Sequence, residues 1–505
     1  MSSSKVRDAV AGSIAASAAI GASEAAAGLL PGVPSLVESI GDWVIDVVPA
    51  PVKDLAIALF DTNDKLALVI GIVVVTMAIG TATGMAARRR FGIGIAVFGA
   101  FGLAGAAAAA RVAGVSVALI PAGLAIIVGL SVLSRLLGGD VGDSQRESDR
   151  ARRRFLIGAG AFAGLAVAGA GVGRYLLEAS KRSAAARDEV VLPVAAEVAS
   201  PPGLDADFGL PGLSPTITPN SDFYRIDTAL SVPKVDIQDW SLSISGMVDR
   251  PYSIDLFDLL GMRMVERYVT LSCVSNRVGG DLVGNAKWLG VRLTDVLDRA
   301  GVAAGAEQIV GRSVDGFTVG FPVAAAYDGR EALVAMGMNG EPLPFEHGFP
   351  ARLVVAGLYG YVSATKWLSE IELTTWGGFD AYWVPRGWAK EAPVKTQSRI
   401  DTPRGQRVTA GRIVVAGVAW APHRGISRVE VQLGRDAPWV DAEMSEPLSD
   451  DAWRQWNVEW DATEGNHSVS VRATDGEGAL QDEATRPPAP DGATGWHTVS
   501  VGVDP

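Results

Sequence analysis

The stretch CVSNRVGGDLVGNAKWLGVRLTDVLDRAGV runs from Cys273 to Val302 and opens with the only cysteine among 505 residues. It follows a β-like run, ERYVTL, and begins as a polar loop rich in glycine. A lone thiol can be a buried small hydrophobe, a nucleophile beside a base, or a thiolate ligand whose metal takes its other ligands from a cofactor. A position at the end of a strand favours a functional thiol, because reactive groups are often held there.

The remaining composition excludes several classes of site. One cysteine rules out an intramolecular disulfide and any multi-cysteine zinc site. The chain has four histidines, none in a metal-binding spacing such as HExxH, so a metal held by protein ligands alone is not expected. A net charge of −12 argues against nucleic-acid binding.

Residues 1–178 are dominated by alanine, glycine, valine, leucine and isoleucine, and they predict a membrane region of about five helices. A span needs roughly 20 apolar residues. The expected spans are Ala9–Leu30, Leu66–Ala87, Phe91–Ala110, Val112–Leu137 and Phe155–Leu177. The proline- and acid-rich residues between the first two predict amphipathic helices at the membrane surface.

Basic residues predict the orientation of these spans. With five spans, Lys5 and Arg7, Arg88 to Arg90, and the five arginines of 146–154 all fall on one side, which the positive-inside rule makes cytoplasmic. Everything after about residue 178 is then extracytoplasmic. Arg152, Arg153 and Phe155 before the last span also match a twin-arginine export signal, which we expect to remain as an anchor; the alternative is an ordinary positive-inside cluster.

Three further parts follow: a linker over 179–222, an α+β domain over 223–400 and an immunoglobulin-like β-sandwich over 401–505. In the α+β domain, Trp240–Val248 predicts a strand, a helix begins at Ser253 as N-cap, and another is capped by Thr294 and ended by Gly301. After Thr402, short alternating runs separated by turn residues predict the sandwich.

The Cys273–Val302 stretch, together with MNGEPLPFEHGFPARLVVAGLYGYVSATKWLSEIEL, resembles the core of the sulfite oxidase family of molybdopterin enzymes. The resemblance covers about residues 215–505, and the multispan start resembles membrane-bound actinobacterial members. It implies one molybdenum–molybdopterin per chain, with Cys273 as the protein's sulfur ligand to the metal. A soft thiolate suits such a metal. It also implies that the sandwich can mediate a homodimer.

The same resemblance implies the other site residues by position. Arg225 takes a catalytic place beside Cys273. The cofactor-binding positions, Cys273 among them, are Phe223, Tyr224, Arg225, Asp227, Asn276, Asp315, His347, Arg352, Ser363, Thr365 and Lys366. Animal members have histidine where Asp227 stands.

This sequence departs from the family where the family binds sulfite. A family arginine falls on Val278, with Arg277 as its neighbour; another falls on Asp491, and a tyrosine falls near Trp388. Because a pocket that lacks two cations attracts a dianion less, sulfite is doubtful, and a small sulfur- or nitrogen-oxo compound such as a sulfoxide becomes the expected substrate.

No CxxCH motif and no histidine before residue 347 are present, so we expect no haem. Electrons must then pass to a separate partner, either a cytochrome or a quinone-linked subunit. Two other hypotheses remain open: a catalytically silent exported binding protein, and a membrane-assembly or transport component with a soluble domain.

Overall fold

The computed structural model describes residues 3–30, 33–49, 52, 59, 64–138, 185–229, 232–405 and 407–505. They fall into two compact units, a helical one at the start of the chain and a larger one that begins at residue 184. The fifth predicted span, Phe155–Leu177, and the arginine motif before it lie outside the described residues.

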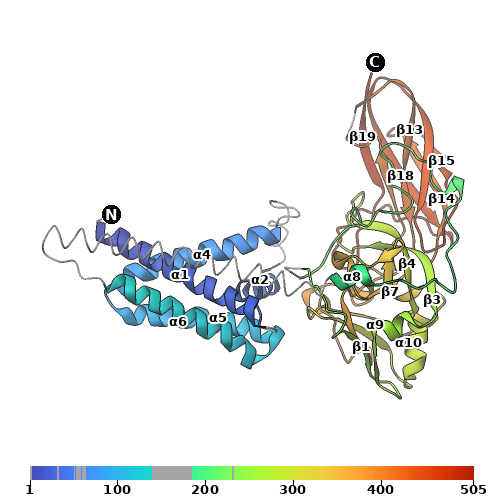
Figure 1. Cartoon of the computed structure of the whole chain (residues 1–505). Helices are drawn as coiled ribbons and strands as arrows, with labels where there is room; N and C mark the ends of the chain where they lie inside the picture. Colours follow the sequence, from blue (N-terminus) through green and yellow to red (C-terminus); the bar gives the residue numbers. More distant parts are fainter. Residues whose placement is uncertain are drawn as a thin grey trace. The chain divides into compact units, whose positions relative to one another are not determined.

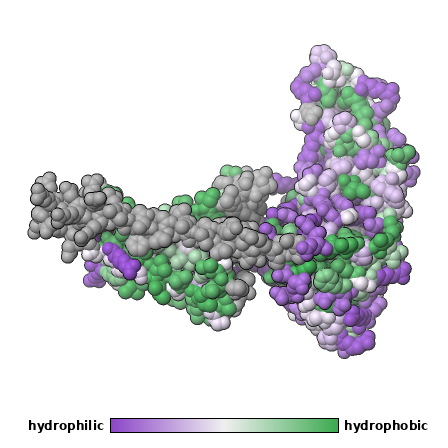
Figure 2. Space-filling model, in the orientation of Figure 1, coloured by the Kyte–Doolittle hydropathy of each residue, from purple (hydrophilic) through white to green (hydrophobic). Residues whose placement is uncertain are grey.

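The first unit is a bundle of long apolar helices (Figure 1): α1 (Ser3–Leu29), α4 (Asp64–Ala87), α5 (Phe91–Ala113) and α6 (Val115–Leu137), with the shorter α2 (Leu36–Val47) beside them. Within the described residues, four helices are long and apolar enough to cross a membrane, over Lys5–Leu29, Ala67–Ala87, Phe91–Arg111 and Val115–Leu137. Their outer faces expose large hydrophobic side chains, and Figure 2 shows this surface as mostly hydrophobic. Burial in lipid would satisfy such a surface, which supports membrane association.

Helices α1 and α4 approach closely because glycines line their contact. A Cβ on Gly12 would lie 2.0 Å from the Gly80 carbonyl oxygen, and one on Gly84 would lie 2.2 Å from that of Asp8. The start of α1 therefore lies beside the end of α4. Arg88, just after α4, donates to the carbonyl of Leu137 at the end of α6. These contacts bring Lys5, Arg7 and Arg88 to the same end of the bundle.

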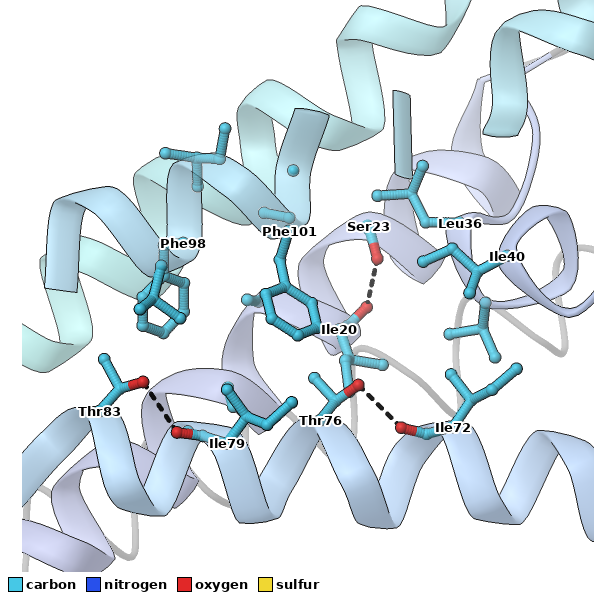
Figure 3. Close-up of a pocket in the computed structure, with 18 residues that line it drawn as sticks. Ile20, Ser23, Leu36, Ile40, Ile72, Thr76, Ile79, Thr83, Phe98 and Phe101 are labelled. Atoms are coloured by element: carbon cyan, nitrogen blue, oxygen red, sulfur yellow. Dashed lines mark hydrogen bonds between the residues drawn. The ribbon is translucent and has the colours of Figure 1, made fainter. Parts of the chain in front are cut away.

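A cavity of about 90 Å³ lies inside this bundle and is lined mainly by aliphatic side chains and by Phe98 and Phe101 (Figure 3). The hydroxyls of Ser23, Thr76 and Thr83 line it too, but each donates to a carbonyl of its own helix, at 2.7–2.8 Å. The cavity is thus apolar in character.

The second unit begins with a segment expected to be a linker, but residues 185–222 are mostly packed against the domain that follows. Glu197 pairs with Val265 as a β-bridge, Arg187 donates to the carbonyl of Leu343 at 2.8 Å, and Thr218 bonds Asn285 in both directions. Apart from α8 (Ala185–Glu189) and η3 (Leu204–Ala206), the segment is irregular, which is why its proline-rich sequence looked like a free connection.

One mixed sheet, one antiparallel sheet and short helices form the α+β domain. One sheet has the order β2-β1-β10-β5-β6 and the other β3-β4-β7-β8, with β9 also paired to β7. The strands are β1 (Ser241–Gly246), β2 (Tyr252–Asp255), β3 (Met264–Ser272), β4 (Val283–Arg292), β5 (Gln308–Ser313), β6 (Thr318–Pro322), β7 (Ala332–Met338), β8 (Glu341–Pro342), β9 (Arg352–Val355) and β10 (Leu368–Thr374). The helices are α9 (Leu256–Leu260), α10 (Leu293–Ala300), α11 (Ala324–Tyr327), α12 (Gly360–Ser363), η4 (Phe345–His347) and η5 (Val384–Arg386). One continuous apolar core joins both sheets.

Two predicted helix starts are wrong. Ser253 lies in β2, paired with Ser243, and the N-cap of α9 is Asp255, whose carboxylate accepts from the Asp258 N–H at 2.8 Å. Thr294 lies inside α10, which begins at Leu293 without a side-chain cap, while Gly301 ends that helix with φ +73° as expected. In both cases the preceding strand continues up to the first residue of the helix. The residue predicted as the N-cap is therefore not at the N-cap position.

The C-terminal residues form two facing sheets, as the alternation predicted (Figure 1). Their orders are β11-β13-β17-β16 and β12-β19-β18-β14-β15. The strands are β11 (Gln397–Thr402), β12 (Arg407–Thr409), β13 (Gly411–Trp420), β14 (Ile426–Leu433), β15 (Trp439–Asp441), β16 (Glu443–Met444), β17 (Arg454–Ala462), β18 (Gly465–Asp475) and β19 (His497–Asp504). Alternate residues of both sheets fill a core around Trp456. The overall prediction of apolar helices, then an α+β domain, then a sandwich is confirmed.

Candidate active site

Cys273 directly follows β3, where the chain turns away from the sheet. Its N–H donates to the carbonyl of Leu282 at 2.9 Å, and its own carbonyl accepts from the Asn276 N–H at 3.0 Å. The Asn276 side chain then accepts from the Leu282 N–H at 3.0 Å. These three hydrogen bonds hold the Cys273 backbone in place, and the Asn276 side chain stabilises the loop.

The thiol of Cys273 is buried, and burial raises its pKa. A buried thiol without a cation stays protonated, whereas a bound metal ion favours the thiolate. Tyr224 lies close to it: burial, then the nearby Cys273, raise the pKa of Tyr224, while Arg352 acts in the opposite sense. Tyr224, itself half-buried, therefore lies within electrostatic reach of both the buried Cys273 and the buried Arg352.

Arg352, at the start of β9, is 5% exposed. One of its terminal nitrogens donates to the His347 carbonyl at 3.1 Å, and its guanidinium lies 5.0 Å from the centre of the Trp288 ring. Burial lowers its pKa to about 10. Among the described residues no carboxylate forms an ion pair with Arg352, so a buried positive charge is left for some other anion.

His347 lies next to Arg352. Its Nε2 is 3.0 Å from the Asn220 carbonyl, which can only accept, so Nε2 carries the proton and Nδ1 remains an acceptor. Burial lowers its pKa to about 4, which keeps the ring neutral at pH 7. Phe223 packs edge-on against His347 and against Trp288, which holds the ring in place.

Lys366 completes what we call the cation cluster (Arg352 and Lys366, with the neutral His347 ring beside them). Its ammonium donates to Asp227 at 2.9 Å and to the Glu346 carbonyl at 3.1 Å. Burial lowers its pKa to about 8, so it is still charged at pH 7. Asp227 also binds Arg225 at 2.8 Å. The structure thus brings the predicted Arg225 into an ion pair on the partly exposed side of this cluster.

Three other predicted residues lie around Lys366. The hydroxyl of Thr365 and one carboxylate oxygen of Asp315 are buried and find no hydrogen-bond partner in the part of the chain that the structure describes. The other oxygen of Asp315 holds a tight turn by accepting from the Phe317 N–H at 3.1 Å, and this turn is tied to Trp367 through the Val314 N–H at 3.0 Å. Ser363 bonds the Tyr359 carbonyl at 3.1 Å and therefore stabilises α12.

Sequence reasoning missed two residues at this site. Trp288 of β4 underlies Arg352 and contacts Phe223, and Asn220 fixes the tautomer of His347 through its carbonyl. Trp288 stood inside the decisive Cys273–Val302 stretch as the aromatic residue of an otherwise aliphatic strand, which could have indicated a packing role. A backbone carbonyl leaves no signal in a sequence.

Comparison with known proteins places this geometry in a family. A family model described as "Oxidoreductase molybdopterin binding domain" matches residues 229–383. Human mitochondrial sulfite oxidase is 29% identical over 341 residues, which cover 57% of this chain and 62% of the relative. An uncharacterized oxidoreductase, YuiH, of Bacillus subtilis (strain 168) is 34% identical over 139 residues, which cover 28% of this chain and 67% of the relative. This chain belongs to the sulfite oxidase family of molybdopterin-dependent oxidoreductases.

The fold of this sulfite oxidase family member also matches a solved structure. The sulfane dehydrogenase SoxCD from Paracoccus pantotrophus superposes with a TM-score of 0.51 at 23% identity, covering 58% of this chain and 85% of the other. At this identity the match shows a shared fold. The predicted family and fold class are therefore confirmed, while the chain spans about 62% of the length of its human relative.

The residues present fit the cofactor that the family implies. Molybdopterin carries a dithiolene, a phosphate and a pterin with several polar edge atoms. The site offers a buried soft sulfur at Cys273, a buried cation without an acid at Arg352, and two unpaired buried oxygens on Thr365 and Asp315. The guanidinium and the two oxygens are costly to bury alone and would gain partners from such a molecule, and the sulfur could ligate its metal.

Proposed function

We propose that this chain is a membrane-anchored molybdenum-cofactor oxidoreductase that transfers an oxygen atom to or from a small sulfur- or nitrogen-oxo compound. The observation that carries the proposal is the buried guanidinium of Arg352, which forms no ion pair with an acid among the described residues. Tyr224 lies within electrostatic reach of both Arg352 and Cys273. A protein that bound no anion here would be stabilised by an uncharged side chain at this position. The region around Tyr224 therefore suits a ligand that brings a negative charge to Arg352.

In this proposal each residue has a defined task. Cys273 would hold the molybdenum, which when bound supplies two-electron oxygen-atom exchange. Arg352 and Lys366 would pair with the phosphate side of the pterin, and neutral His347 would offer Nδ1 as an acceptor. Thr365 and Asp315 would bond polar pterin edges. Phe223 and Trp288 keep water away from the cations, which strengthens their attraction for an anion.

The substrate is proposed from this chain's own pocket positions. Val278, Trp388 and Asp491 stand where the family gathers cations and a tyrosine to bind sulfite. The similar proteins are named for different sulfur compounds, as sulfite oxidase and sulfane dehydrogenase. Membership of the family therefore does not by itself determine the substrate. Loss of cations favours a neutral oxo compound over a dianion.

We further propose an extracytoplasmic site and a separate redox partner, a cytochrome or a quinone-linked subunit. The orientation is supported by the bundle, in which the start of α1 and the ends of α4 and α6 share one end. Lys5, Arg7 and Arg88 to Arg90 therefore gather at one face, as the positive-inside rule requires for the cytoplasmic side. Residues after the predicted last span then lie on the opposite side of the membrane.

Metal analysis of the full chain, purified in detergent from a molybdate-supplied host, tests the proposal. We expect about one molybdenum per chain and at least about a tenfold loss in the Cys273→Ser variant, with the oxidised pterin still detectable by fluorescence. Ser253→Ala, on an exposed strand away from the site, serves as the control and should keep the metal. A folded wild-type chain without metal or pterin would instead support a silent binding or assembly protein.

A further inference from the structure

The loop that opens with Cys273 has a base and a tip. At the base, the Cys273 N–H donates to the Leu282 carbonyl at 2.9 Å. Farther along, the Gly280 N–H donates to the Arg277 carbonyl at 2.8 Å and forms a tight turn. We call residues 279–281 the loop tip. Because the loop is short and internally bonded, a contact that holds the tip also limits the movement of Cys273.

His497, the first residue of β19 in the sandwich, packs against this tip. Gly279 has φ +74°, and a Cβ there would lie 2.2 Å from Nε2 of His497, so only glycine allows the loop to approach the ring this closely. The ring is itself fixed, because its Nδ1 accepts from the Ile400 N–H at 3.0 Å. Since β11 and β19 belong to different sheets, His497 joins the two sheets of the sandwich where the loop tip meets them.

Arg399 of β11 reaches the same tip with its side chain. One terminal nitrogen donates to the Gly280 carbonyl at 2.8 Å and lies 3.5 Å from the Asp281 carboxylate. The other two nitrogens donate to Asp401 at 2.5 Å and to the Ser214 hydroxyl at 2.7 Å. The guanidinium is therefore held on three sides, and its charge strengthens the hydrogen bond to the loop backbone.

The tip needs such support because its glycines have no side chains with which to pack. Strand β3 ends at Ser272 and β4 begins at Val283, so no strand pairing holds the residues between them. Two adjacent glycines also give this backbone a wide conformational freedom. A sulfur that ligates a metal has to be held in one place by its surroundings. The sandwich supplies part of that support from outside the loop.

We propose, on the basis of the function proposed above, that Arg399 and His497 of the sandwich are positioning residues for the metal-binding loop. They hold the loop tip through Gly279 and Gly280 and thereby fix the place of the Cys273 thiol. They act on the loop backbone and not on the reacting atoms. The C-terminal sandwich is in this way a component of the metal site as well as a neighbouring domain.

Thiol labelling tests this proposal, because Cys273 is the only cysteine in the chain. In the full chain made without the cofactor, we expect iodoacetamide to alkylate Cys273 at least about tenfold faster in His497→Ala than in the wild type, since local opening of the loop exposes the buried thiol. The matched control is His467→Ala on β18, whose ring packs against Trp460 and bonds the Thr463 carbonyl. Its labelling rate should stay within about twofold of the wild type.

The two histidine variants are compared at urea concentrations that give them the same free energy of unfolding, so that global unfolding does not explain a difference. Equal labelling rates under these conditions would overturn the proposal. Arg399→Lys gives a second, milder test, because it keeps a cation beside Asp401 but loses the branched guanidinium that reaches Gly280. We expect about fivefold faster labelling in this variant, and a rate equal to that of the wild type would contradict the role of Arg399.

The holoenzyme gives a readout that a merely structural role would not change. The electron paramagnetic resonance spectrum of the partly reduced enzyme should show a broadened or second molybdenum signal in His497→Ala, and the wild-type signal in His467→Ala. A metal-free wild type refutes the proposed function, while labelling still decides whether the sandwich holds the loop. A loaded enzyme whose spectrum and labelling rate are unchanged in His497→Ala refutes only this inference.

Discussion

The cation cluster and the sandwich loop Pro488–Ala493 differ in how each accommodates positive charge. The cluster holds Arg352 at 5% exposure without an acid, whereas the loop closes Lys395 against Asp491 in a pair whose side chains are 25% and 51% exposed. A buried charge without a partner costs several kcal/mol, while an exposed pair is worth little. The difference indicates that the first region awaits an anionic ligand and that the second does not.

The largest effect should come from two equally buried arginines. Arg352 and Arg399 are each 5% exposed, but Arg399 binds Asp401 at 2.5 Å. Arg352→Met should lower the pterin content about tenfold or more and raise the unfolding free energy of the cofactor-free protein by about 1–3 kcal/mol. Arg399→Met should instead cost about 3–5 kcal/mol, because it removes the cation that pairs with the buried Asp401 carboxylate. Chemical denaturation and pterin fluorescence measure both changes.

This comparison fails if Arg352→Met destabilises the cofactor-free protein as much as Arg399→Met does. Arg352 would then be a structural cation like Arg399, and its missing acid partner would say nothing about a ligand. Measurement on cofactor-free protein is essential, because a bound cofactor stabilises the wild type by mass action and would hide the gain.

The next effect compares two lysine–aspartate pairs of similar length. Lys366 and Asp227 are 2.9 Å apart with side chains 11% and 3% exposed, whereas Lys395 and Asp491 are 3.1 Å apart and more exposed. Lys366→Met should cost about 3 kcal/mol, since it removes the ammonium that pairs with the buried Asp227 carboxylate. Lys395→Met should cost less than about 1 kcal/mol. Urea unfolding at pH 7 measures the loss of stability in each variant. Equal losses would show that burial does not make the first ion pair more important than the second.

Parts of this picture were predictable from the sequence. Cys273 stood at the end of a strand-like run before a glycine-rich loop, and the structure places it there. The strands β13, β14, β17, β18 and β19 matched their alternating patterns, because one face of each is buried in the sandwich core. The helix starts predicted at Ser253 and Thr294 were wrong, because a capping residue is only a local signal. At both positions the pairing of the neighbouring strand determines where the helix begins.

The pairing of charges was beyond sequence reasoning. Lys366 and Asp227 are 139 residues apart, and they meet because the connection between α12 and β10 lies against the segment after residue 219 in the fold. The sequence around Arg352 likewise does not indicate that its guanidinium would form no ion pair with an acid among the described residues. The irregular residues 185–222 looked like a linker because their contacts are made by backbone groups and scattered side chains without a period.

The smallest effect tests whether any buried charge without a partner indicates a ligand. Asp451, 7% exposed, lies at the seam between the α+β domain and the sandwich, where its carbonyl accepts from the Thr270 N–H. Burial, followed by the nearby Glu331 and Asp450, raises its pKa to about 7, while the His423 N–H and Arg330 act in the opposite sense. Here the neighbours are acids, so protonation rather than an anion relieves the charge.

Because the folded pKa of Asp451 lies above its ordinary value of 3.8, the folded state binds this proton more tightly than the unfolded state. Stability should therefore fall as the pH rises from about 4 to about 8, by an amount on the order of 2 kcal/mol. Asp451→Asn should remove that part of the slope and be the more stable protein at pH 8, with little difference at pH 4. Asp450→Asn, an exposed neighbour, should leave most of the slope in place. If Asp451→Asn lowered the stability at pH 8 as well, the carboxylate would have a cationic partner, and the contrast between Arg352 and the closed pairs would need a different physical basis.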